Sequence, residues 1–268
     1  MLLNYSITLI TYIVCLPIIC YCNPVQHIYS LADSSSDSDL YASGVDFYLS
    51  NLPNSTDPLD TSITCIEDLD YKTAFLYFYD ADGFNNDTGH LAKSLIDRKI
   101  QVEYVITPLI PSMILPSTLI NSVLQNLKTN DLSPKFMWMN IINSGEDVES
   151  NIDYLAGLRS ALQENDIGIG LIAIPEIWDF YYNKWSKPAE ENDLLWVDLV
   201  LDNFDEFESF GGWDRVSVIS PTTVVQCEMK FGNLSYRKDD IDAHFKTNSS
   251  VKAINVMIIL IVFILSTL

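Results

Sequence analysis

The chain has 268 residues and a formal net charge of −21, with 36 acidic side chains against 15 basic ones. The acidic excess is spread along the chain, which makes nucleic acid a poor partner because its phosphates are also negative. The roughly 200 residues between two apolar ends suffice for one domain with its own core and are too few for two.

The chain begins with a segment typical of a signal peptide. Residues 2–22 are almost wholly apolar and carry no charged side chain, as in the hydrophobic region of secretory signals. We expect residues 1–23 to be cleaved near Cys22 or Asn23, which places the mature protein outside the cytosol. An uncleaved signal anchor is the alternative, because no Lys or Arg precedes the apolar run; the break at Pro17 favours cleavage. Residues 24–40, rich in Ser and Asp, are expected to be a flexible leader.

Short apolar segments recur through residues 41–238 and predict buried strands. They are continuously apolar, as in a parallel sheet covered on both faces by helices. The clearest helix is predicted over 149–163, where Leu155, Leu158 and Leu162 recur at spacings of three and four. We therefore expect an α/β fold, an irregular TIM-like β/α barrel of one domain. An open doubly wound sheet is the alternative, although no Gly-rich phosphate loop supports it. The predicted strands are 44–47, 74–79, 102–108, 136–142, 167–174, 194–200 and 216–219.

The C-terminal residues 253–268 form a second apolar segment, unbroken from Val256 to Leu265. A transmembrane helix needs about 20 apolar residues, and this run is shorter. Small residues at 248–250 precede it, as in the signal for a glycolipid (GPI) anchor. We expect residues 239–252 to link the domain to this anchor, which holds the protein on the outer face of the plasma membrane. A short transmembrane helix is the alternative.

Cysteines and glycosylation triplets fit a secreted protein. Three of the five cysteines lie in the signal segment, which leaves Cys65 and Cys227. An even pair in an oxidising compartment predicts one disulfide bond; two buried free thiols are the alternative. The three histidines show no metal-ligand spacing, so no metal or other cofactor is predicted. N-glycosylation is predicted at Asn54, Asn86, Asn233 and Asn248.

Three motifs resemble the invertebrate-type lysozymes of glycoside hydrolase family 25. They are "YASGVDF" at 41–47, "YKTAFLYFYDADG" at 71–83 and "FESFGGWD" at 207–214, and the resemblance covers most of residues 41–236. It implies an irregular β/α barrel that cleaves peptidoglycan after N-acetylmuramic acid. It also implies a bond between Cys65 and Cys227, because the matching cysteines are paired in that family. Glycoside hydrolysis requires two carboxyl groups flanking the scissile bond.

The catalytic motif of that family is altered here. The family has D-x-E at the end of a central strand, whereas this chain reads "MWMNIINSG". Asn140 and Ile142 stand at the positions of the Asp and the Glu, and Asn233 stands at the position of a further carboxylate. Ser220 and Pro221 replace a Gln–Tyr pair of the family. Of the family's acidic residues, Asp46 alone remains. The general acid is typically worth about 100- to 10,000-fold in rate.

We therefore expect a catalytically inactive, lysozyme-like protein at the cell surface or secreted, which binds peptidoglycan or another glycan in innate defence. Tyr79 and Trp213 are candidates for stacking on sugar rings, and Trp138 and Trp196 are expected in the core. An active muramidase with rearranged acids is the alternative, as is a surface protein whose loops alone bind partners. The acids in or just after predicted strands are Asp80, Asp82, Glu103 and Glu176. Asp80 and Asp82 are explained as turn residues before Gly83, and Glu176 is explained by its place at a helix start.

Overall fold

The computed structural model describes residues 40–47, 63–142, 144–226 and 229–241, and all of them belong to one compact unit. Several predictions fall outside these residues and are not addressed by the fold. They concern the signal segment 1–23, the leader 24–40 up to residue 39, Asn54, Cys227, Asn248, the linker 239–252 beyond residue 241 and the tail 253–268.

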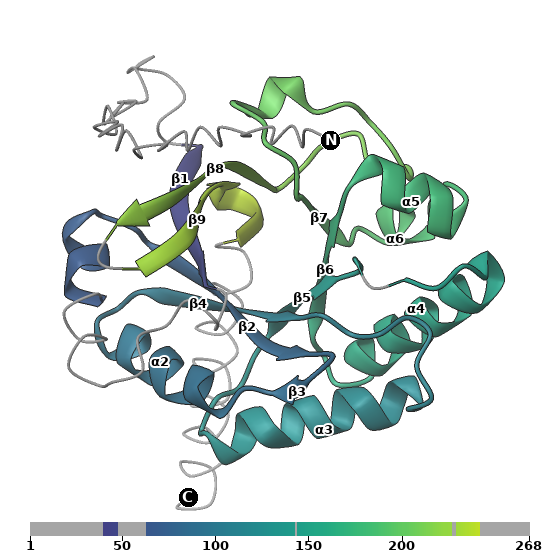
Figure 1. Ribbon diagram of the computed structural model, residues 1–268, viewed down its shortest axis with the longest axis horizontal. Coiled ribbons are helices and arrows are strands. Elements are labelled where there is room, and N and C mark those ends of the chain that lie inside the picture. The colour runs from purple at the N-terminus through teal and green to yellow at the C-terminus, as the bar shows by residue number, and fades with distance from the viewer. Residues whose placement is uncertain (1–39, 48–62, 143, 227–228, 242–268) are drawn as a thin grey trace, which may run out of the picture. The chain divides into compact units, whose positions relative to one another are not determined.

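The strands close into a barrel, as predicted, and do not form an open sheet. Eight strands follow one another in the order β1-β9-β8-β7-β6-β5-β4-β2, and β1 also pairs with β2 to complete the ring (Figure 1). The short β3 (Gly83–Phe84) pairs with the end of β2 outside the ring. The barrel strands are β1 (Tyr41–Phe47), β2 (Thr73–Asp80), β4 (Gln101–Ile106), β5 (Phe136–Asn140), β6 (Gly168–Ala173), β7 (Leu194–Val197), β8 (Val218–Gln226) and β9 (Met229–Arg237).

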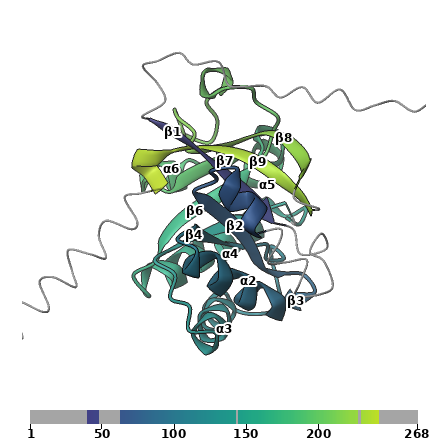
Figure 2. The same ribbon diagram turned by 90° about the vertical axis from the view of Figure 1, so that its left-hand side faces the viewer.

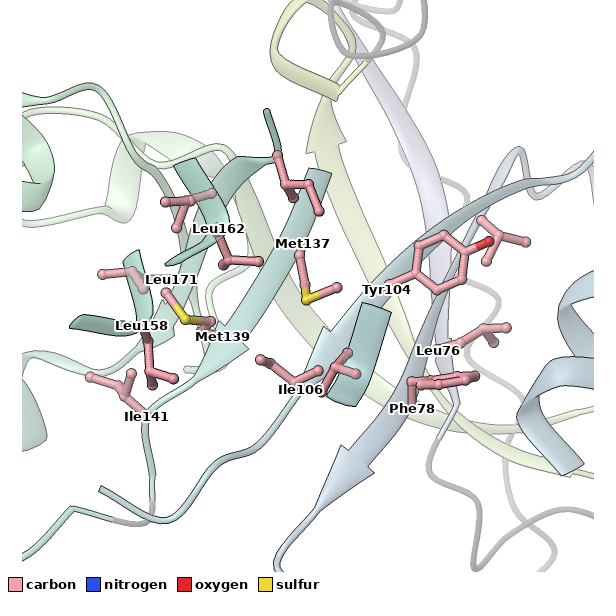
Figure 3. Packing of buried hydrophobic residues seen from close by; sticks show 14 of the residues in the cluster. Leu76, Phe78, Tyr104, Ile106, Met137, Met139, Ile141, Leu158, Leu162 and Leu171 are labelled. Carbon is pink, nitrogen blue, oxygen red and sulfur yellow. The ribbon is translucent and has the colours of Figure 1, made fainter. Parts of the chain in front are cut away.

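The helices lie outside the ring of strands (Figure 1). The predicted helix 149–163 is confirmed as α4, which begins after Asp147. The side chain of Asp147 caps the helix by accepting hydrogen bonds from the backbone N–H groups of Glu149 at 3.1 Å and Ser150 at 3.4 Å. Leu158 and Leu162 of α4 belong to the buried cluster between the helices and the barrel wall (Figure 3). The helices are α2 (Asn86–Asp97), α3 (Pro116–Thr129), α4 (Val148–Gln163), α5 (Pro175–Tyr182), α6 (Lys187–Glu190) and the 3-10 turn η2 (Phe204–Glu206).

The last strand was not predicted, and it changes the topology. β9 is antiparallel to both of its neighbours, β8 and β1, so the sheet is not wholly parallel as expected. Figure 2 shows β8 and β9 side by side along their length. The segment was missed because it alternates: Leu234 and Tyr236 are buried inside the barrel, while their neighbours Asn233 and Ser235 are only half-buried. It therefore lacks the continuous apolar run that marked the other strands.

Large aromatic side chains fill the middle of the barrel. The predicted core positions of Trp138 and Trp196 are confirmed, because both are fully buried and their ring centroids lie 6.1 Å apart. Gly170 of β6 makes room for them, since a Cβ at this position would lie 2.5 Å from the Cζ3 atom of Trp138. The interior is thus packed, and a ligand has access only to the ends of the barrel or to its outer surface.

Candidate functional site

One end of the barrel collects three polar side chains, two of which the sequence singled out. Asp46 lies near the end of β1, Asn140 is the last residue of β5, and Asp198 directly follows β7. Since β1, β5 and β7 run in the same direction around the barrel, these residues lie at the carboxyl ends of their strands, where β/α-barrel enzymes place their active sites. We call this end the mouth of the barrel.

Asp46 is held inside the mouth by its neighbour on β9. The backbone N–H of Gly232 donates a hydrogen bond to Oδ1 of Asp46, which is only 8% exposed. The pKa of Asp46 is raised to about 6, mainly by burial and to a smaller extent by the negative charge of Asp198, while the hydrogen bond from Gly232 opposes the rise. Asp46 is thereby set to exchange a proton in the mildly acidic range.

Asp198 is the mouth residue that sequence reasoning missed. It ends the run "LLWVD", in which Trp196 points into the barrel interior. The period of two along a strand therefore directs Asp198 to the same side. Asp198 keeps an exposed face, while surrounding residues partly bury its carboxyl group and raise its pKa. The alternation could have revealed this residue, but its proximity to Asp46 follows only from the closed ring.

Asn140 and Ile142 differ in burial. Asn140 is 4% exposed, and its Oδ1 accepts a hydrogen bond of 3.2 Å from the backbone N–H of Ile142. Ile142 was expected inside a strand spanning 136–142, but β5 ends at Asn140 and Ile142 is 53% exposed. The amide of Asn140 caps the strand end, which turns the chain outward at this point.

Asn233 lies on the outer face of the barrel wall. It pairs with Val45 in the β1–β9 ladder, and Val45 belongs to the core between the barrel and the helices. Residues paired across a ladder share a face, so the β9 residue that faces Asp46 is Gly232 and not Asn233. Ser220, in contrast, is tied to the interior, because its Oγ accepts a hydrogen bond of 3.0 Å from Nε1 of Trp196.

The two candidates for sugar stacking have different surroundings. Tyr79 is half-buried near the end of β2 and packs edge-on against Phe84, with ring centroids 5.1 Å apart. Trp213 is 6% exposed, and its Nε1 donates to the carbonyl oxygen of Asp193 at 2.8 Å. Asp193 precedes β7, so Trp213 lies at the opposite end of that strand from Asp198. The expectation that Trp213 could stack on a sugar is therefore corrected: its ring is part of the core.

The other acids have the local roles foreseen for them, with one exception. Oδ1 of Asp80 accepts a hydrogen bond of 2.9 Å from the N–H of Asp82 in the turn before Gly83. Glu176 lies in the first turn of α5, after Pro175. Glu103 is the exception, because it is 2% exposed inside the barrel.

The predicted disulfide and glycosylation sites are described only in part. Cys65 is disulfide-bonded, and the pairing with Cys227 stays a prediction because Cys227 lies outside the described residues. Asn86 is the first residue of α2. Within the described part of the chain, no group of three or more His, Cys, Asp or Glu side chains could hold a metal ion. No helix in that part is long and apolar enough to cross a membrane.

Comparison with solved structures identifies the fold. The autolysin LytC of Streptococcus pneumoniae superimposes with a TM-score of 0.57 at 8% identity, covering 73% of this chain and 46% of LytC; this chain thus spans about half of LytC. A family 25 glycosyl hydrolase from Bacillus anthracis gives 0.53 at 14% identity, covering 75% of this chain and 90% of its own. The catalytic domain of endolysin ply40, from bacteriophage P40 of Listeria monocytogenes, gives a TM-score of 0.51 at 11% identity. The match covers 76% of this chain and 96% of the ply40 domain.

The barrel is therefore of the glycoside hydrolase family 25 type, which confirms the fold that the sequence motifs implied. A search among curated protein sequences gave no match. A family model described as Lysozyme-like protein 1 matches residues 44–219, more than half of the chain. The chain belongs to this lysozyme-like family.

Proposed function

We propose that this protein is a catalytically inactive member of the lysozyme-like barrels that binds peptidoglycan or a related glycan at its mouth. The observation that carries the proposal is that the mouth has the amide of Asn140 at the end of β5, where the family has a carboxyl group. Its amide occupies a buried place at the end of β5 and accepts the N–H of Ile142. An amide has no proton of suitable acidity to give to a leaving oxygen and no charge to stabilise an oxocarbenium-like transition state.

Binding without cleavage is chemically reasonable at this mouth. The carboxyl groups of Asp46 and Asp198 are hydrogen-bond acceptors for sugar hydroxyls, and the half-buried ring of Tyr79 lies near the end of β2. Among proteins of the same fold, LytC has been solved with a synthetic peptidoglycan ligand. Endolysin Cpl-1 has been solved with a peptidoglycan analogue.

The test combines a clearing assay with a sedimentation assay on the secreted protein. We expect no loss of turbidity in a suspension of bacterial cell walls, with an active family 25 lysozyme as the positive control. We expect the protein to sediment with insoluble peptidoglycan, and Asp46→Ala to reduce the bound fraction. Failure to sediment with any wall preparation would contradict glycan binding and favour a role for the surface loops alone.

A working hydrolase with rearranged acids is the second candidate. It is favoured by the proximity of the carboxyl groups of Asp46 and Asp198 at the mouth. The raised pKa of Asp46 is of the kind that suits a general acid. If the protein clears cell walls, Asp46→Asn and Asp198→Asn should each abolish the activity. Asp202→Asn, at an exposed aspartate four residues further along, is the matched control and should leave it unchanged.

Restoring the family's acids one at a time separates the two candidates further. Because Ile142 is 53% exposed, Ile142→Glu should change the free energy of unfolding by no more than about 0.5 kcal/mol. It should remain inert, because a single acid lacks the partner that stabilises the sugar cation. Measurable clearing by this single variant would show that Asp46 and Asp198 already supply the missing functions.

We also propose that the mature protein is held at the outer face of the plasma membrane by a lipid anchor that replaces its apolar tail. The support comes from the sequence of residues 248–268. Release from intact cells by a phospholipase specific for glycolipid anchors is the expected result. Retention, with residues beyond 256 detected by mass spectrometry, would favour a transmembrane helix instead.

A further inference from the structure

A cavity of about 400 Å³ opens at the end of the barrel opposite the mouth. Its walls come from the start of β4, the start of β5, the loop between α3 and β5, and the end of α2. This volume is within the range of about 300 to 1,000 Å³ in which small-molecule sites fall. Nothing in the proposed glycan site at the mouth involves it.

The cavity exists because β4 begins before its pairing with β5 does. The β4–β5 ladder starts with Tyr104 opposite Met137. Residues 101–103 of β4 are paired with β2 on one side and face the cavity on the other. The loop that would close this gap is held away, since the carbonyl oxygen of Lys135 accepts a hydrogen bond of 2.9 Å from the N–H of Gly168 on β6.

The inner wall of the cavity is polar and preorganised. Glu103 is 2% exposed and its carboxyl oxygens accept hydrogen bonds from Nε1 of Trp138 at 3.1 Å and from Nε2 of Gln101 at 3.3 Å. Burial raises the pKa of Glu103 to about 8, against the opposing effect of these two hydrogen bonds. A neutral carboxyl group carries an O–H donor as well as an acceptor oxygen.

The rim of the cavity is cationic in a protein that is otherwise strongly acidic. Lys99 and Lys135 both line it and are exposed, and neither forms an ion pair within the described residues. Asp131, also on the rim, is paired with Lys93 at 3.2 Å. The remaining wall is apolar, with Ile100 and Phe136 buried beside it.

We propose that this cavity is a binding site for a small organic anion that also carries an amide or carbonyl oxygen and an apolar body. The anionic group lies at Lys99 and Lys135, where it gains two cations that have no other partner among the described residues. The carbonyl oxygen reaches the carboxyl group of Glu103, and the apolar body packs on Ile100 and Phe136. The ligand class follows from the order of the groups along the cavity: the lysines are at the rim, the apolar wall comes next, and the carboxyl donor lies innermost.

The indole N–H of Trp138 provides a direct readout, because it is hydrogen-bonded to Glu103. We would titrate the full mature protein with N-acetyl-L-leucine, which has a carboxylate, an amide carbonyl and an isobutyl group, and follow the indole resonances by NMR. A saturable shift of the Trp138 resonance is expected. N-acetyl-L-leucinamide, which lacks the carboxylate, should bind more weakly.

Variants test the two ends of the site separately. Lys135→Met should weaken binding roughly two- to five-fold, as expected for one exposed charge pair, and Lys187→Met in α6 is the matched control that should bind as the wild type does. Glu103→Met removes the hydrogen-bond donor, which glutamine would retain, and should weaken binding while leaving the exposed lysines intact. No saturable shift of Trp138 would overturn the proposal, and so would equal binding by the wild type and Lys135→Met. Neither outcome bears on the glycan site at the mouth.

Discussion

The backbone N–H of Gly232 on β9 donates a hydrogen bond to the Oδ1 of Asp46 on β1, although the two residues are 186 positions apart in the chain. The contact is so close that a Cβ atom on the β9 side would displace the carboxyl group of Asp46. A Cβ at position 232 would lie 2.7 Å from Cγ of Asp46 and 2.9 Å from its Oδ2. The β1–β9 pairing that helps to close the barrel thus also positions the mouth carboxyl group.

We therefore predict that Gly232→Ala destabilises the protein by about 1 to 3 kcal/mol, the usual effect of overpacking. Chemical denaturation measures this directly. Ser235→Ala, at a half-buried position of the same strand, should cost about 0.5 kcal/mol or less. Combining Gly232→Ala with Asp46→Ala should recover part of the loss, because the clash is then removed. Strictly additive effects of the two substitutions would show that the contact is not the cause.

The raised pKa of Asp46 predicts a pH dependence of stability. Because the folded pKa of about 6 exceeds the ordinary value of 3.8, the folded state binds the proton more tightly than the unfolded state. The contribution of Asp46 to stability therefore falls as the pH rises from 3.8 to about 6 and is constant at higher pH. Asp46→Asn removes the ionisable group and should be more stable than the wild type at pH 7, by up to about 3 kcal/mol.

Denaturation of both proteins between pH 4 and pH 7 tests this prediction. The stability difference should be small at the acid end and grow with pH. Asp198→Asn should shrink it, because the neighbouring negative charge contributes to the raised pKa. A difference that does not change with pH would contradict the assignment.

Gly170→Ala should disturb the aromatic interior. The added Cβ would lie 2.5 Å from Cζ3 and 2.7 Å from Cδ2 of Trp138, and the indole cannot move away because Trp196 and Phe75 surround it. We expect a loss of about 1 to 3 kcal/mol, measured by thermal or chemical unfolding. Gly170→Ala together with Trp138→Phe should be less destabilised than the sum of the two single variants. Additivity would instead indicate that the backbone of β6 absorbs the new methyl group.

Glu103 predicts a second pH window, at higher pH than that of Asp46. Burial raises its pKa from 4.5 to about 8, so its contribution to stability falls between these two values and is constant above the upper one. Glu103→Gln should therefore gain stability relative to the wild type as pH rises, by an amount of the order of a few kcal/mol at pH 9. Denaturation from pH 5 to pH 9 measures the difference. A difference that does not change from pH 5 to pH 9 would show that Glu103 ionises like an exposed carboxyl group.

Local patterns in the sequence were sufficient to predict most elements of the fold. The apolar runs mark seven of the eight barrel strands, and the leucine spacing marks α4 because it reflects one buried face of a helix. The motifs pointed to the correct fold family, and the resemblance that they carry singled out Asp46 and Asn140, which both lie at the mouth. These inferences succeed because each depends on residues close together in the chain.

The tertiary structure alone decided how the ring closes and what meets at the mouth. β9 inserts between β1 and β8 in the antiparallel sense, which brings Gly232 against Asp46 and directs Asn233 to the outer face. The same closure places Asp198 near Asp46, while Trp213 lies at the far end of β7. The physical reason is that pairing between distant strands sets these contacts, and a hydrophobic pattern defines which face of a strand is buried without defining which strand lies beside it.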